Sequence, residues 1–110
     1  MQVIVKRVGE AQELVDVQGD VYNTLQSHIG GWFEHIELEV DGTVVDVWLD
    51  EEGKLKNLPI NLRVPGDVLV GPLVFTGGAD AEGRTLGVSP SIVEAVTRLL
   101  NGTARSVDWA

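Results

Sequence analysis

Residues 32–49 read WFEHIELEVDGTVVDVWL, and this stretch decides the fold. On both sides of Asp41-Gly42, polar and apolar residues alternate as they do in half-buried β-strands. Asp-Gly is a strong signal for a tight hairpin turn, so we predict two antiparallel strands over 32–40 and 43–49. In the first strand, one face is expected to carry Trp32, Glu34, Ile36, Leu38 and Val40, and the other Phe33, His35, Glu37 and Glu39. In the second strand, one side is expected to carry Thr43, Val45, Val47 and Leu49, and the other Val44, Asp46 and Trp48.

Further strands are indicated on both sides of this hairpin. Segment 2–8 is rich in β-branched residues, and segment 13–17 fits a short second strand. The apolar run 67–77 fits a central buried strand, although Gly71-Pro72 inside it predicts a bulge or an edge position. Segment 54–66 contains two prolines and little periodicity, so we predict an ordered loop there.

Two helices have clear boundary signals. Asp20 is placed to cap a helix that ends at Gly30 or Gly31, and Ser89-Pro90 opens a second helix that ends before Gly102. The predicted fold is α+β, with two helices and a mostly antiparallel sheet of about five strands. We expect a single domain over 1–104 and a C-terminal tail over 105–110. Val107 and Trp109 of that tail would suit a small interface in a homo-oligomer.

The composition argues against several classes of function. The 110-residue chain has 17 acidic and 8 basic residues, a net charge of −9 and no cysteine. It therefore has no disulfides, thiolate metal sites or cysteine nucleophiles, and its surface should repel nucleic-acid phosphates. We expect no signal peptide, because Met1 is followed directly by the predicted strand 2–8. No apolar run approaches the ~20 residues of a membrane helix. We expect a cytoplasmic protein that contacts neither membrane nor nucleic acid directly.

Negative charge is concentrated in and after the predicted hairpin. Residues 34–52 contain eight acidic residues and no Lys or Arg. Such a surface could mimic a phosphate backbone and bind a basic protein. The partner-binding residues that this hypothesis selects are Glu37, Glu39, Asp46 and Trp48. The alternative is an ordinary solvated sheet face in an acidic protein.

A local group of basic residues follows the hairpin. Lys54, Lys56 and Arg63 bracket Asn61 within ten residues. Together these four side chains could hold an anionic small molecule such as a nucleotide signal. The alternative is that the lysines offset the acids at 50–52 and that Asn61 fixes its own loop.

We expect neither a metal site nor a catalytic site. The acids at 50–52 are adjacent and lack the ligand spacing of a calcium loop, so a solvated turn is favoured. His28 and His35 are the only histidines, and a zinc site needs a third ligand. His35 with Glu34 or Glu37 could act as a general base, but no nucleophile is marked beside it. No cofactor motif is present, so none is expected.

Three motifs in order resemble those of a family of small phage, plasmid and bacterial proteins known as a domain of unknown function. They are GGWFEHIEL (30–38), EEGKLKNLPIN (51–61) and GDVLVGPLVFTG (66–77), and the resemblance covers roughly residues 25–90. The family often continues with NRRA after the asparagine, whereas this chain has NLRV, so Leu62 departs from the pattern. The resemblance implies a setting in mobile elements, and it implies no reaction.

The sequence is compatible with three functions. The favoured one is a non-enzymatic accessory protein of a phage or mobile element that binds a host protein through the acidic surface, in host takeover or anti-defence. The second is an oligomeric binder or sponge of an anionic small molecule, built around the basic group. The third, an enzyme using His35 with nearby acids, is the least favoured.

Overall fold

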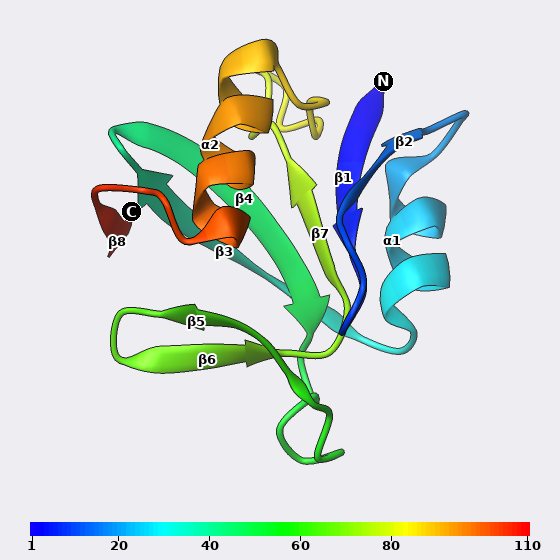
Figure 1. The fold of residues 1–110 in the computed structure, drawn as a ribbon. Helices are drawn as coiled ribbons and strands as arrows, with labels where there is room; N and C mark the ends of the chain where they lie inside the picture. The colour runs from blue at the N-terminus through cyan, green and yellow to red at the C-terminus, as the bar shows by residue number, and fades with distance from the viewer.

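A computed structural model describes residues 1–110 as two β-sheets and two α-helices (Figure 1). The larger sheet is antiparallel throughout, with the strand order β2-β1-β7-β4-β3-β8, and the smaller sheet is the pair β5–β6. The elements are β1 (Gln2–Lys6), β2 (Glu13–Asp16), α1 (Val21–Ile29), β3 (Phe33–Val40), β4 (Thr43–Asp50), β5 (Ile60–Val64), β6 (Asp67–Val70), β7 (Leu73–Thr76), α2 (Pro90–Asn101) and β8 (Val107–Trp109). The α+β prediction is confirmed, with eight strands rather than about five.

Strands β3 and β4 form the predicted hairpin. They pair without a shift in register, from Phe33 opposite Asp50 to Val40 opposite Thr43. Asp41 and Gly42 both have positive φ, 50° and 83°, which is the pattern of a type I′ turn. The predicted alternation is confirmed along most of the hairpin, because Leu38, Val40, Val45, Val47 and Leu49 are buried while the glutamates of the opposite face are exposed. Towards the start of the hairpin the core ends, so Ile36 is half-buried and Trp32 is exposed.

The segment between residues 54 and 77 differs from the prediction. Segment 54–66, expected to be a loop, contains β5, which pairs with β6. The run 67–77, expected to be one strand, is divided at Gly71-Pro72 into β6 and β7, which lie in different sheets. Pro72 has no N–H for a ladder, and Gly71 has a φ of 74°, which glycine adopts readily. The chain therefore bends here and passes from one sheet to the other.

The last residues also differ from the prediction. Within the expected tail, Val107–Trp109 form β8, which pairs with Leu38–Val40 at the edge of the larger sheet. The carboxylate of Asp41 accepts hydrogen bonds from the backbone N–H of Ser106 and Arg105 and from Nε of Arg98. These donors hold the pKa of Asp41 below its usual range, and the Ser106 N–H has the largest effect. Asp41 therefore both shapes the hairpin turn and fixes the chain that leads into β8.

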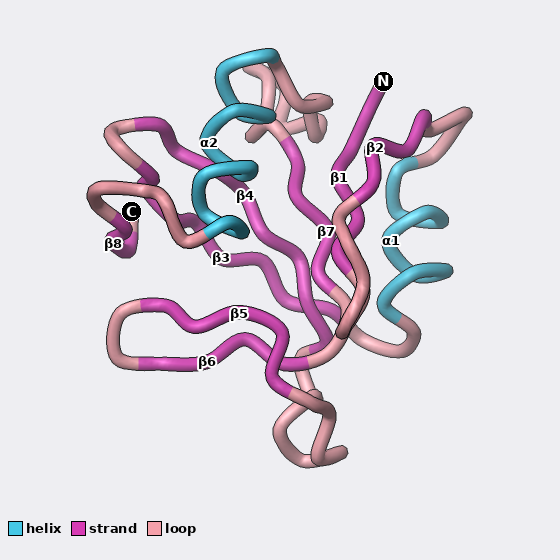
Figure 2. The backbone as a smooth tube through the Cα atoms, viewed as in Figure 1, coloured by secondary structure: helices cyan, strands magenta, loops and turns pink.

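The helices begin and end where the sequence predicts. The Asp20 side chain accepts a hydrogen bond from the Tyr22 N–H at the start of α1, and the Ser89 side chain accepts one from the Ile92 N–H at the start of α2. Gly102 closes α2 in the left-handed conformation. The connections are drawn in pink in Figure 2, where the longest one joins β7 to α2.

The two helices lie on opposite faces of the larger sheet. Helix α2 and the β5–β6 hairpin pack on the face that carries Ile4 and Phe75. Helix α1 packs on the other face, against Val3, Val5 and Val74 of β1 and β7. On this second face, β3, β4 and β8 extend beyond the helix (Figure 1). Half of one sheet face is therefore left without a covering helix.

Candidate functional site

The uncovered half of the α1 face is acidic. Its carboxylates come from Glu37 and Glu39 of β3, Asp46 of β4 and Asp108 of β8, and we call this set the acidic half-face. Glu37 lies opposite Asp46, and Glu39 lies opposite Asp108. Residues directly opposite each other share a face, with Cβ atoms about 4.5–5.5 Å apart. Strands β3, β4 and β8 carry no Lys or Arg, so no basic side chain of these strands offsets the charge.

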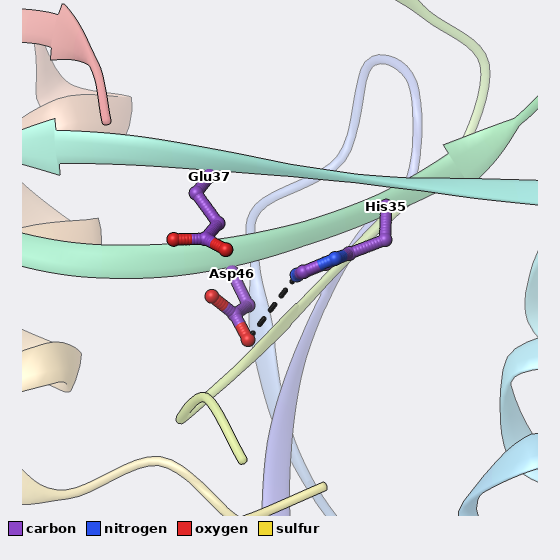
Figure 3. Close-up of side chains that lie close together, drawn as sticks. All are labelled: His35, Glu37 and Asp46. Carbon is purple, nitrogen blue, oxygen red and sulfur yellow. Dashed lines mark ion pairs between the residues drawn. The ribbon is translucent and has the colours of Figure 1, made fainter. Parts of the chain in front are cut away.

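His35 and Asp46 are in contact at one end of this surface (Figure 3). Nε2 of His35 lies 3.2 Å from Oδ2 of Asp46. The imidazole stacks on the Trp48 ring, with 4.6 Å between centroids and 29° between planes. Trp48 in turn donates from Nε1 to Oγ1 of the fully buried Thr76 at 2.9 Å. The orientation of His35 is therefore fixed by its neighbours on β4 and β7.

Asp46 is the carboxylate of this surface that is most removed from water. Only 7% of the residue is exposed, and no Lys or Arg contacts it. Burial raises the pKa of Asp46 above its usual range and Glu37 raises it further, while His35 opposes the shift. The protein thus holds a partly desolvated negative charge whose sole close counter-group is an imidazole.

His35, Glu37 and Asp46 could together hold a cation. Their ligand atoms all lie within 4.8 Å of one another, and all three side chains extend to the same side of the β3–β4 hairpin (Figure 3). One imidazole and two carboxylates form a donor set that suits divalent transition metals. The same negative charge also suits the ammonium or guanidinium group of a protein partner.

Burial of Asp46 gives a prediction for pH dependence. The pKa of Asp46 in the folded state is raised above the usual ~3.9, so the folded protein binds this proton more tightly than the unfolded chain does. The resulting stabilisation is complete below pH ~3.9. It is lost as the pH rises through the raised pKa, because the buried carboxyl group then becomes charged. The amide that replaces the carboxyl group in the Asp46→Asn variant does not titrate. This variant should therefore match the wild type in melting temperature near pH 3.5 and exceed it by a few degrees at pH 8.

Melting curves at both pH values test this prediction. The Glu39→Gln variant is the control, because it removes an exposed carboxylate from the same face. It should shift the melting temperature by a smaller amount at pH 8. A wild type more stable than Asp46→Asn at pH 8 would show that the contact with His35 outweighs the cost of burying the charge.

The four residues expected to bind an anion mostly have internal partners. Lys54 pairs with Asp67, and Lys56 pairs with the buried Asp50 at 2.7 Å. The Asn61 amide donates to two backbone carbonyls and accepts from Lys6. Arg63 is exposed and has no ion pair. An anionic ligand would therefore have to displace the carboxylates that already pair with both lysines.

The turn at residues 50–52 is built by its own hydrogen bonds. Oδ1 of Asp50 accepts from the Glu52 N–H at 2.8 Å, and Oδ2 of Asp50 accepts from Lys56. Asp50 is 4% exposed, whereas Glu51 and Glu52 are exposed. This arrangement agrees with the expectation of a turn, and Lys56 offsets one of its three acids, Asp50.

A groove lies on the opposite face of β3 and β4. It encloses a volume of about 210 Å³ between β3, the turn after β4, strand β6 and β8. Its apolar lining comes from Ile36, Leu49, Leu55, Val68, Leu69, Val70 and Trp109. Glu34, Asp50, Glu51, Lys54 and Asp67 supply its polar lining, so the groove is also more acidic than basic. Sequence reasoning did not identify this groove, because β6 and β8 meet β3 and β4 only through the tertiary fold.

Comparison with known proteins shows which family the chain belongs to. The chain belongs to the domain of unknown function DUF3846, whose family model matches residues 1–101. The resemblance to such a family that the sequence motifs indicated is thereby confirmed. No curated protein and no solved structure matches the chain. Neither helix has the length and apolar character needed to cross a lipid bilayer.

Proposed function

We propose that this member of DUF3846 is a non-enzymatic accessory protein of a phage or other mobile element that binds a basic host protein in the host cytoplasm. Such a protein would act in host takeover or in countering a host defence. The observation that supports the proposal most is the acidic half-face, where the exposed Glu37, Glu39 and Asp108 and the nearly buried Asp46 share one sheet face without an intervening Lys or Arg.

The charge of this surface favours a basic partner for a physical reason. Like charges placed opposite each other on a sheet destabilise it, and an arriving Lys or Arg relieves that repulsion. Glu37 and Glu39 are exposed, so they can pair with a partner without first breaking an internal ion pair. Complementary charge also accelerates encounter, so binding should weaken as salt is raised.

The neighbouring aromatic and buried residues have a supporting role in this proposal. Trp48 is half-buried beneath His35, and Asp46 is almost fully buried. Both were selected from the sequence as partner-binding residues. We propose that they set the shape and charge of one end of the surface, while Glu37 and Glu39 make the direct contacts.

Charge reversal tests the proposal. The double variant Glu37→Lys, Glu39→Lys should lose the host proteins that wild type retains in pull-downs from host lysate, quantified by mass spectrometry. The control is Glu10→Lys with Glu94→Lys, two exposed acids outside the acidic half-face. Each double variant changes the net charge from −9 to −5, because each Glu-to-Lys replacement adds 2.

The three possible outcomes of this comparison are distinct. Loss of the same proteins from the Glu37/Glu39 variant, with retention by the Glu10/Glu94 variant, supports the acidic half-face as the binding surface. Equal loss from both variants would mean that overall charge alone attracts those proteins. Equal retention by both would show that this surface does not bind them.

A further inference from the structure

Strand β3 is only partly paired on its outer side. Strand β8 covers Leu38–Val40, and the last contact beyond it is the Ala110 N–H donating to the Glu37 carbonyl. No strand pairs with residues 33–36 on that side, because β8 is the last strand in the order of the sheet. We call residues 33–37 the open edge of β3.

The backbone groups at this edge can be assigned from the paired part of the strand. The Glu37 carbonyl and the Asp41 N–H both bond toward the chain around β8. Alternate residues in a strand point their N–H and C=O groups to the same side. The N–H and C=O of His35 therefore point outward along the open edge, with no backbone partner among β4, β8 and the loops.

The open edge lies between the two surfaces described above. Glu34 and Ile36 line the groove on one face, and His35 and Glu37 stand on the other face at the acidic half-face. Successive residues of an added strand would face these two surfaces in turn. Every second side chain of the added strand would meet Ile36, Leu55 and Trp109 in the groove, and the side chains between them would meet Glu37 and its neighbours.

We propose that the open edge accepts an extended segment of a basic protein as an additional β-strand, in line with β8. Apolar residues of that segment enter the groove, and its alternate Lys or Arg residues pair with the acidic half-face. The main-chain bonds to His35 supply affinity, and the two flanking surfaces supply specificity. The chemistry assigned to the partner rests on the proposed function.

The charge of the edge decides between a partner and a second copy of the chain. Proteins often protect an exposed edge with lysine, proline or a bulge, and residues 33–37 contain none of these. Their protection is the negative charge of Glu34 and Glu37. That charge opposes pairing with a second chain of net charge −9 and favours a basic strand.

The test uses a short blocked peptide in which lysine and valine alternate, with binding measured by calorimetry at about 150 mM salt. Wild type should bind it, and a peptide of the same composition with lysines and valines in separate blocks should bind at least about tenfold more weakly. Two analogues methylated on alternate backbone nitrogens provide the signature of strand addition. One set of N–H groups faces β3 and the other faces solvent, so one analogue should lose binding and the other retain it.

Substitution at His35 tests the protein side of the same contact. His35→Pro removes the outward N–H while leaving the ladder to β4 intact, and it should weaken peptide binding by about tenfold or more. His35→Ala removes the imidazole but keeps the N–H, so it should bind within about threefold of wild type. Thermal melting shows whether both variants are folded. If His35→Pro does not fold, binding of the methylated peptides to wild type still decides the question.

The possible failures are separable. If both methylated analogues bind as well as the parent peptide, strand addition is wrong. If binding survives His35→Pro but is lost in the Glu37→Lys, Glu39→Lys variant, the acidic surface binds the partner without strand addition. If sedimentation shows that wild type self-associates and that His35→Pro is monomeric, the occupant of the edge is a second copy, and the partner assignment is overturned.

Discussion

Replacing Gly77 with alanine is expected to lower the free energy of unfolding by about 4 kcal/mol or more, enough to unfold much of a domain of ordinary stability. A Cβ atom at Gly77 would lie 2.0 Å from the carbonyl oxygen of Gly87 and 2.9 Å from its carbon. Both of these are backbone atoms, so no side chain can rotate to make room. The Gly77 N–H also donates to the Leu86 carbonyl at 2.9 Å, which fixes the two segments together.

Displacement of this loop should also affect the start of β1. The Val88 N–H donates to the Gln2 carbonyl at 2.8 Å, and a Cβ at Gly87 would also meet the backbone of Gln2. The loop between β7 and α2 is therefore held against both β7 and β1. Displacing it at Gly77 should disturb the start of α2 as well as the end of the central strand.

Urea denaturation followed by circular dichroism measures this effect, and Gly83→Ala is the matched control. Gly83 lies in the same loop with a φ of 79°, and nothing lies within 4 Å of an added Cβ. Its replacement should cost about 1–2 kcal/mol, the cost of placing a non-glycine residue in the left-handed region. Equal losses from the two variants would show that the loop can move away from Gly77 at little cost.

The parts of the fold that the sequence predicts are those set by neighbouring residues. Asp41-Gly42 fixes the hairpin turn, and the period-two alternation then assigns every residue of β3 and β4 to a face. Local capping residues likewise fix the ends of both helices. These features depend on contacts within a few residues, which a sequence pattern displays directly.

The parts that were predicted wrongly depend on contacts far apart in the chain. The run 67–77 has the composition of one buried strand, and only its two different sheet partners show that the bend at Gly71-Pro72 separates two strands. Strand β8 is three residues long and forms where Asp41, some 65 residues earlier, binds the backbone of Ser106. Neither tertiary contact leaves a periodic signal in the local sequence.

The same division applies to the candidate site. The hairpin register follows from its turn, so the placement of Glu37 opposite Asp46 and of His35 opposite Trp48 could be read from the sequence. Glu34, considered beside His35 as a general base, lies on the other face and lines the groove. Asp108 joins the acidic half-face only through β8 and could not be found in this way.

Replacing Asn61 with alanine is the other substitution with a large expected effect, a loss of about 2–4 kcal/mol in the free energy of unfolding. The Asn61 amide donates to the carbonyls of Lys6 and Gly71, both at 2.8 Å, and its oxygen accepts from Nζ of Lys6 at 3.0 Å. It thereby joins the end of β1, strand β5 and the bend between the two sheets. Alanine would leave two partly buried carbonyls without these donors.

Thermal melting should show a decrease of roughly 10–20 °C for Asn61→Ala. Asn61→Asp should not restore stability, because a carboxylate cannot donate to the two carbonyls that the amide satisfies. Arg63→Ala is the control from the same strand, since Arg63 is exposed and has no ion pair, and it should change the free energy of unfolding by less than about 0.5 kcal/mol.

If Asn61→Ala melts at the same temperature as the wild type, the three hydrogen bonds contribute little to stability, and Asn61 would again be a candidate for binding a ligand. If Asn61→Ala melts far below the wild type, the asparagine of the EEGKLKNLPIN motif serves to fasten the smaller sheet to β1 of the larger one, and this structural role explains the asparagine in that motif.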